Sequence, residues 1–262
     1  MEHVMNHQIR KIITGICMLG MALSIAGCGG HKILKEAQPM VTTQQLVSAN
    51  DAQLVTSLDW VIFRDGPGTW VRNADWDQYL MTFTNNSDDV LEIRNATVYD
   101  SLAVPADTQS SRKLLIRGSK QTAKRYRDEG LKVKAGVGGT ALVVAGTATG
   151  AVAVSAGMVV VYGGAAASTA VAAGLLLGPA LIVGGVMKGV NGQKVAKEID
   201  VRQVDLPLRL QPGETQYLNL FFPLSPSPQR VEISYRAHQT DQLLSVDTKT
   251  ALSGLHINSG DE

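Results

Sequence analysis

Hydrophobic and polar side chains alternate along two separate parts of the chain. The two-residue period covers residues 79–83 and 91–93 in the first part, with the polar run 85–89 between them. It returns at residues 206–210 and 231–235 in the second part. Because successive side chains of a strand point to opposite faces, this alternation predicts half-buried β-strands, and the first two strands are expected to form a hairpin.

Neither part alone holds enough strands for a stable sheet. Each supplies about three, which is marginal for an independent sheet with a core, whereas together they supply about six to eight, the number in a small β-sandwich. We therefore predict an α+β fold, with one sandwich whose halves are residues 50–104 and 190–236, interrupted by a helical insertion. The arrangement resembles an immunoglobulin-like domain. Residues 237–262 are polar and are expected to form a loosely ordered C-terminal tail.

A basic segment, residues 105–134, follows the first half of the sandwich. Strong helix formers dominate from about Ser110 to Glu129, and Gly130 follows as a C-terminal stop. Its cations form either a solvated helix face or, because they border an uncharged segment, a membrane-surface patch in which each contributes about 1 kcal/mol. The residues expected at that surface are Lys120, Lys124, Arg125, Arg127, Lys132, Lys134 and Lys188.

Residues 135–189 are the least polar part of the chain. Between Lys134 and Lys188 no residue is charged, and 12 of the 53 intervening residues are glycine. Since one membrane-spanning helix needs about 20 apolar residues, this length fits two spans joined by a turn. We expect the two helices at residues 142–161 and 166–187. Two spans return the chain to the membrane face that it left, as a shared sandwich requires.

Glycines recur within this segment at spacings of four and seven. In a helix such spacings fall on one face, and a stripe without side chains lets two helices approach closely in lipid. The glycines expected to pack the helices are Gly146, Gly150, Gly157, Gly164, Gly174 and Gly178. The segment resembles the glycine-zipper membrane hairpins of some bacterial outer-envelope lipoproteins. Two other interpretations stay open: a buried alanine-rich helical pair packed against the sandwich in water, and an amyloid-like or disordered loop.

The first 27 residues have the features of an export signal. Two basic residues precede the apolar stretch 12–26, and small residues then lead to Cys28. The run 25–28, Ile-Ala-Gly-Cys, resembles the lipobox of bacterial lipoproteins. The resemblance implies that Cys28 receives a diacylglycerol, becomes the first residue after cleavage and begins a tether over residues 28–49. Because glycine rather than aspartate follows Cys28, it also implies outer-membrane sorting with the soluble part in the periplasm; an ordinary signal peptide is the alternative.

The exported part offers few residues for chemistry. Cys17 lies in the leader and Cys28 would carry lipid, so no thiol remains for a disulfide, a zinc site or a nucleophile. The histidines His31, His238 and His256 have no metal-ligand spacing. We therefore expect neither a metal nor a cofactor.

Two sequence patterns imitate catalytic or nucleotide-binding motifs. Residues 136–141 match the dinucleotide fingerprint G-x-G-x-x-A, but no acidic residue follows about 20 positions later to bind the ribose. Ser234, His238 and Asp241 could be drawn as a hydrolytic triad, yet no nucleophile elbow surrounds the serine. We therefore expect that the protein is not an enzyme.

The net charge and the aromatic residues indicate which classes of partner to expect. The full chain has a formal net charge of +1, which gives no reason to expect nucleic acid. Trp60, Trp70 and Trp76 lie within 17 residues and are expected to pack in the core, with a membrane-interface or partner-binding patch as the alternative.

The expected partners are membrane lipids together with further copies of the chain or other envelope proteins. The expected function is structural or protein-interacting in the cell envelope, and the alternative is an oligomeric pore or secretion component built through the glycine-rich hairpin.

Overall fold

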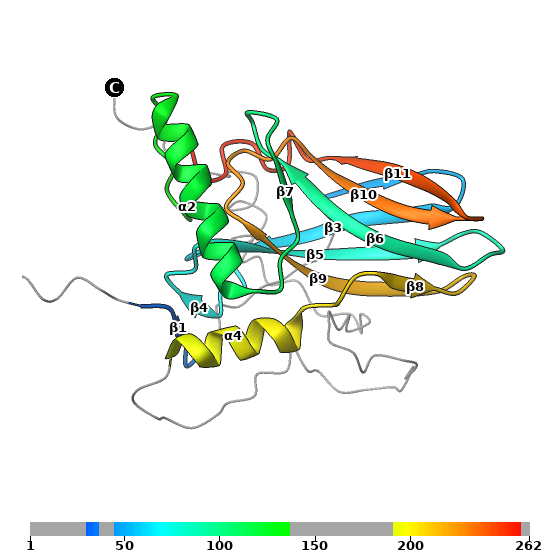
Figure 1. Cartoon of the computed structure of the whole chain (residues 1–262), viewed down its shortest axis with the longest axis horizontal. Helices are drawn as coiled ribbons and strands as arrows, with labels where there is room; N and C mark the ends of the chain where they lie inside the picture. The colour runs from blue at the N-terminus through cyan, green and yellow to red at the C-terminus, as the bar shows by residue number, and fades with distance from the viewer. Residues whose placement is uncertain (1–29, 37–44, 137–190, 258–262) are drawn as a thin grey trace, which may run out of the picture.

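Antiparallel strands stack as two sheets, with two helices at one end of the stack (Figure 1). The computed structural model describes residues 30–36, 45–136 and 191–257. One sheet has the strand order β2 (Val47–Asn50), β3 (Leu54–Ile62), β5 (Trp76–Asn85) and β9 (Thr215–Pro223). The other has the order β11 (Thr240–Asp247), β10 (Arg230–Ala237), β6 (Leu91–Tyr99) and β7 (Pro105–Asp107), and β8 (Leu208–Leu210) also pairs with β6. The predicted α+β fold with a β-sandwich is confirmed.

The two parts of the chain share both sheets. Strand β5 pairs with β9, placing Tyr79 opposite Leu220. Strand β6 pairs with β10, placing Ala96 opposite Ile233. Each sheet therefore contains strands from before and from after the insertion, as the strand count predicts.

The predicted hairpin between the first two strands is wrong. Strand β5 pairs with β3 and β9, whereas β6 belongs to the other sheet. The connection crosses between the sheets, and the Asn85 side chain holds it by donating to the carbonyl oxygens of Asp89 (2.7 Å) and Leu210 (3.0 Å). Alternation predicts a buried face for each strand, but it does not say which strand is its neighbour.

Burial follows the predicted period of two on β10, whereas large parts of β3, β5 and β9 are buried on both faces. On β10, Val231 and Ile233 are fully buried while Glu232 between them is half-buried. The first half of β5 is buried on both faces, since Trp76 and Gln78 are covered as well as Tyr79. The extra cover comes from a partial third layer: β1 (Lys32–Ile33), β4 (Val71–Arg72) and helix α4 (Asn191–Arg202).

Helix α2 (Arg112–Asp128) forms where the sequence predicts a helix. Its buried positions recur every three or four residues and face the sandwich: Leu115, Ser119, Thr122 and Tyr126. At Gly118 a side chain would collide with the ring of Pro223 at the end of β9. Gly130, with φ of +78°, ends the helical path as predicted.

Three expected boundaries differ in the structure. Part of the expected tether is folded, because β1 pairs with β4 and β2 pairs with β3. The expected polar tail contains β11, an edge strand on β10, followed by a buried turn with Leu252 and Leu255. The first residues of the expected second half form α4. The expected hairpin lies outside the described residues, and no helix among those described is both long and apolar enough to cross a membrane.

Candidate functional site

Both ends of the uncharged segment join the sandwich at the same end, which we call the insert pole. It is formed by loop 63–75, helices α2 and α4, and residues 251–257, at the left of Figure 1. The opposite end, the loop pole, is formed by the turns 51–53, 86–90, 211–214 and 238–239. Gly136, the last described residue before the segment, and α4, which begins directly after it, both belong to the insert pole.

Gly136 is held by the C-terminal residues. Its N–H donates to Nδ1 of His256 at 3.3 Å, and the N–H of Lys134 donates to the His256 carbonyl oxygen at 3.0 Å. Gly136 has a φ of +81°, and a Cβ at this position would collide with the carbonyl oxygen of Arg64. Because only glycine fits such a position without strain, the chain enters the segment in a fixed direction.

His256 in turn bonds a carboxylate in the core. Its Nε2 lies 2.8 Å from Oδ2 of Asp77, and both side chains are 0% exposed. Since Nδ1 accepts the N–H of Gly136, Nε2 carries the proton and donates to Asp77. With no exposed atom, the pair has no access to a substrate, and it acts by holding Gly136 in position.

Two oxygens beside this pair are buried without a hydrogen-bond partner among the described residues: Oδ1 of Asp77 and the hydroxyl of Tyr79. Burial, and then the neighbouring charge of Asp77, raise the pKa of Tyr79 well above its usual value. The Tyr79 ring packs edge-on against Phe222, with centroids 4.9 Å apart. The tyrosine is therefore a neutral core side chain.

Asp75 joins the N-terminal segment to loop 63–75. Nε2 of His31 lies 3.4 Å from its carboxylate, and Arg64 forms an ion pair with the same carboxylate. Arg64 also donates to the carbonyl oxygens of Asn73 (2.9 Å) and Ala74 (2.8 Å). Burial alone would raise the pKa of Asp75, but the hydrogen bond from His31 and the charge of Arg64 hold it below its usual value.

His31 also links the two helices. Arg112, at the start of α2, donates to its Nδ1, and its ring packs on Trp76 with centroids 4.9 Å apart. Gly192, in the first turn of α4, lies against the same guanidinium, so that a Cβ there would be 3.4 Å from Nη1 of Arg112. A continuous series of contacts therefore connects Gly136, where the uncharged segment begins, to Gly192, just after it ends.

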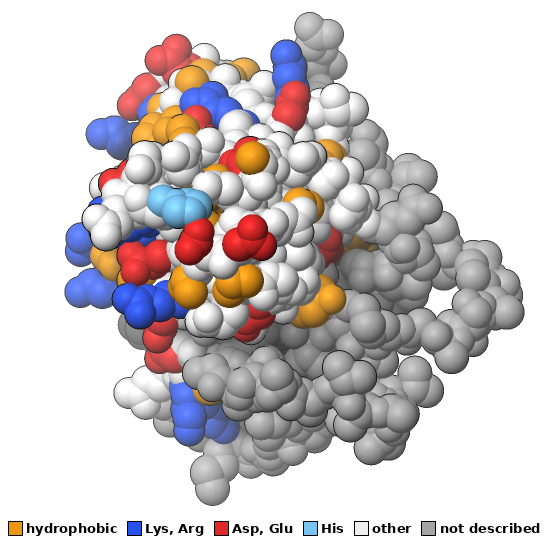
Figure 2. All heavy atoms as spheres, turned by 90° about the vertical axis from the view of Figure 1, so that its right-hand side faces the viewer, with side chains coloured by type: hydrophobic (Ala, Val, Ile, Leu, Met, Phe, Trp, Pro, Cys, Tyr) orange, Lys and Arg blue, Asp and Glu red, His pale blue; other side chains and the backbone are white. Residues whose placement is uncertain are grey.

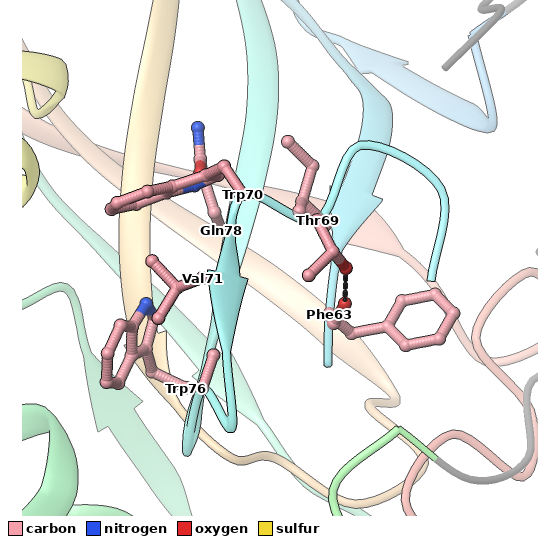
Figure 3. A pocket seen from close by; sticks show the side chains of 8 residues that line it. Phe63, Thr69, Trp70, Val71, Trp76 and Gln78 are labelled. Atoms are coloured by element: carbon pink, nitrogen blue, oxygen red, sulfur yellow. Dashed lines mark hydrogen bonds between the residues drawn. The ribbon is translucent and has the colours of Figure 1, made fainter. Parts of the chain in front are cut away.

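The three tryptophans pack in the core beside this network, which confirms their predicted role. Trp60, Trp70 and Trp76 are each at most 4% exposed. The indole N–H of Trp70 donates to Gln78 at 2.7 Å, and the guanidinium of Arg202 lies 4.4 Å from the Trp70 ring centre. A hollow lined by Trp70, Trp76 and Gln78 together with residues of loop 63–75 (Figure 3) has a volume of about 10 Å³, room for about one water molecule. It does not provide a small-molecule site.

The predicted membrane-surface residues do not all have the same environment. Lys120, Lys124 and Arg127 are exposed on α2, and Lys132 and Lys134 are exposed beyond it. The predicted residues that lie outside the described part of the chain are Cys28, Lys188, Gly146, Gly150, Gly157, Gly164, Gly174 and Gly178.

Arg125 has a second contact that the sequence pattern did not suggest. Its Nη2 lies 3.0 Å from Oδ2 of Asp100, which is 2% exposed, so that Arg125 attaches α2 to the sandwich. Two further basic residues, Lys113 and Arg117, are exposed on the side of α2 that carries Lys120. Their spacing along the helix was the signal that could have identified them.

The candidate triad is not assembled. His238 pairs with Asp89 in the loop pole, while Asp241 pairs with Arg236 at 3.0 Å. In the part of the chain that the structure describes, no group of three His, Cys, Asp or Glu side chains could hold a metal ion.

Comparison of the chain with protein-family models, with curated proteins and with solved structures finds no match in any of the three.

Proposed function

We propose that this protein is a lipid-anchored component of the bacterial cell envelope with a structural or protein-interaction role. In this proposal, acylated Cys28 and the glycine-rich segment 135–189 attach it to the membrane, and the insert pole of the sandwich faces the bilayer. The observation that carries the proposal is the meeting of three chain segments at one pole: residues 30–33, the start of the glycine-rich segment at Gly136, and its end at α4.

The position of His31 supports a short distance between the lipid and the sandwich. Cys28 precedes His31 by three residues, which span at most about 11 Å when fully extended. His31 itself is held by Asp75 and Arg112. A diacylglycerol on Cys28 would therefore enter the membrane beside the insert pole, without the long tether that the sequence suggested.

The positions of the two segment ends support a hairpin rather than a single span. One span would carry the chain to the far side of the bilayer, where α4 could not pack against β1. Two helices of about 20 residues each fit the length between the ends. We further propose that the two helices pack closely through the glycine stripe. We also propose that the sandwich is immunoglobulin-like.

Acyl labelling with membrane fractionation tests the attachment. Cells expressing the chain are fed an alkyne fatty acid, and the protein is expected to carry the label and sediment with outer membranes, whereas Cys28→Ser should remain unlabelled. Equal labelling of both forms would contradict the lipid anchor. Recovery of the wild type only with inner membranes would contradict the location.

A packing comparison tests the hairpin and its alternative role. Gly150→Leu should separate the helices and weaken association by about 1–2 kcal/mol, a typical interhelical contribution in lipid, whereas Val152→Leu on the other side should change little. Native gels in mild detergent give the oligomer distribution for both variants. A single ring-sized oligomer lost only in Gly150→Leu would favour the pore or secretion component. Identical distributions for both variants would contradict glycine-mediated packing.

A further inference from the structure

Helix α2 carries a straight line of cations on the side opposite its packed face. Its exposed basic residues follow one another at intervals of four, three, four and three positions: Lys113, Arg117, Lys120, Lys124 and Arg127. In a helix these spacings keep all five within a narrow sector. We call this set the basic stripe. At 1.5 Å per residue it is about 21 Å long.

The charges of the basic stripe are not neutralised by the fold. Within the described residues, none of its five members forms an ion pair, whereas Arg94, Arg209 and Arg236 on the sandwich are each paired with a carboxylate. Arg125 is turned toward Asp100, and Arg112 toward His31. Of the two acidic residues at the end of the helix, Asp128 borders the stripe at its C-terminal end, four positions after Lys124, and Glu129 lies away from it.

The helix also holds the stripe rigidly beside the proposed membrane attachment. Ser119 donates to the Leu115 carbonyl oxygen (2.9 Å) and accepts the N–H of Leu224 (3.0 Å) from the segment after β9. Tyr126 bonds Ser101 at 2.8 Å. Only seven residues separate the end of α2 from Gly136, where the glycine-rich segment begins.

We propose that the basic stripe docks on the anionic headgroups of a phospholipid bilayer and lays α2 along the membrane surface. The inference rests on the proposed membrane attachment and adds to it a second contact, which fixes the orientation of the sandwich. A phospholipid surface suits the stripe because its negative charge is diffuse and flat, so that a line of cations needs no shaped pocket to bind it. The binding is electrostatic and therefore weakens with salt, whose screening length is about 8 Å at physiological strength and about 3 Å at 1 M.

Lysine footprinting of the full acylated chain in vesicles tests the docking. A membrane-impermeant amine reagent is added to neutral phosphatidylcholine vesicles and to vesicles containing phosphatidylglycerol, and modification at Lys113, Lys120 and Lys124 is measured by mass spectrometry. We expect protection of the three lysines only in the anionic vesicles, and loss of that protection at 1 M salt. A reference lysine introduced at the loop pole, Gln239→Lys, should react equally in both.

Arginine substitutions test whether the basic stripe causes the lysine protection in anionic vesicles. Arg117→Gln with Arg127→Gln should shift the docked-to-undocked ratio about 25-fold, or about 5-fold per cation, while leaving the reporter lysines in place. The matched control, Arg209→Gln with Arg236→Gln near the loop pole, should leave protection unchanged. Thermal unfolding of each variant verifies that α2 still forms.

Flotation of the same vesicles separates this inference from the proposed function. Variants that float normally but lose lysine protection support both the attachment and the docking. Equal protection in neutral and anionic vesicles, or no effect of the arginine substitutions, overturns the docking even if the protein floats. Failure of the wild type to float contradicts the membrane attachment itself.

Discussion

The His256–Asp77 pair at the insert pole and the His238–Asp89 pair at the loop pole are built in opposite ways. At the insert pole, His256 and Asp77 are both 0% exposed and lie 2.8 Å apart. At the loop pole, the side chains of His238 and Asp89 are 58% and 55% exposed. Both histidines have a left-handed backbone, with φ of +63° and +48°. The same residue types therefore form a core contact at one end and a solvent-exposed contact at the other.

The difference extends to the surroundings of each pair. Around His256, the start of the glycine-rich segment, the C-terminal residues and β5 are joined through buried side chains. At the loop pole, three turns meet through backbone hydrogen bonds such as Asn86 to Gln53 and Gly213 to Asn85, and the turn 238–239 joins them through the His238 side chain. Figure 2 looks onto this pole and shows acidic side chains gathered over it, exposed to solvent. The insert pole is built to hold chain segments, and the loop pole leaves its side chains available to the surroundings.

The largest expected effect comes from breaking the buried pair. His256→Ala leaves Asp77 buried without its partner and should cost about 3–5 kcal/mol in the free energy of unfolding. His238→Ala is the matched control, since it carries the same backbone conformation, and should cost about 0–1 kcal/mol. Urea unfolding of the detergent-solubilised chain, followed by tryptophan fluorescence, gives both values. Equal losses in the two variants would contradict the contrast between the poles.

The next effect concerns one glycine at each pole. Gly136→Ala combines a left-handed backbone cost with a collision against the carbonyl oxygen of Arg64, and should cost about 2–4 kcal/mol. Gly213, in the loop pole, has a φ of +73° but open space around its Cα. Gly213→Ala should therefore cost only about 1–2 kcal/mol. The same unfolding assay measures both variants. A larger loss of unfolding free energy in Gly213→Ala would contradict the claim that Gly136 fixes the direction in which the chain enters the segment.

The smallest effect is a pH dependence of the insert pole. The folded-state pKa of Asp75 is held below its usual value, so its stabilising contribution is present above the unfolded pKa of about 3.9 and is lost as the pH falls through the lower folded value. The carboxyl is 38% exposed, so we expect under about 1 kcal/mol. Urea midpoints between pH 6 and pH 2 should fall more steeply for the wild type than for Asp75→Asn. Parallel curves would show that Asp75 does not carry the dependence.

Local patterns predict local structure well in this chain. The alternation at Val231 and Ile233 and the helix formers before Gly130 reflect interactions with near neighbours, and both elements form where expected. The shared sandwich also follows from the sequence, because neither part alone can bury a core.

Long-range contacts account for what the sequence did not predict. His256 follows a polar stretch, yet it is buried because Asp77, 179 residues earlier, accepts a hydrogen bond from its ring N–H. His31 folds onto the sandwich through Asp75 and Arg112, and neither partner is marked by a motif. Arg125 was grouped with exposed cations because its sequence position does not reveal the buried Asp100. Such pairings depend on which strands become neighbours, which the alternation does not determine.

The central claim, that the insert pole faces the membrane, can be measured directly by energy transfer to lipid headgroups. The strands between the poles have nine or ten residues, a span of about 30 Å. A donor dye is placed on Lys134→Cys at the insert pole or on Asp88→Cys at the loop pole of the full acylated chain, in nanodiscs with acceptor-labelled headgroups. If the insert pole faces the membrane, energy transfer is strong from position 134 and weak from position 88. Equal transfer from both positions, or stronger transfer from position 88, would contradict it.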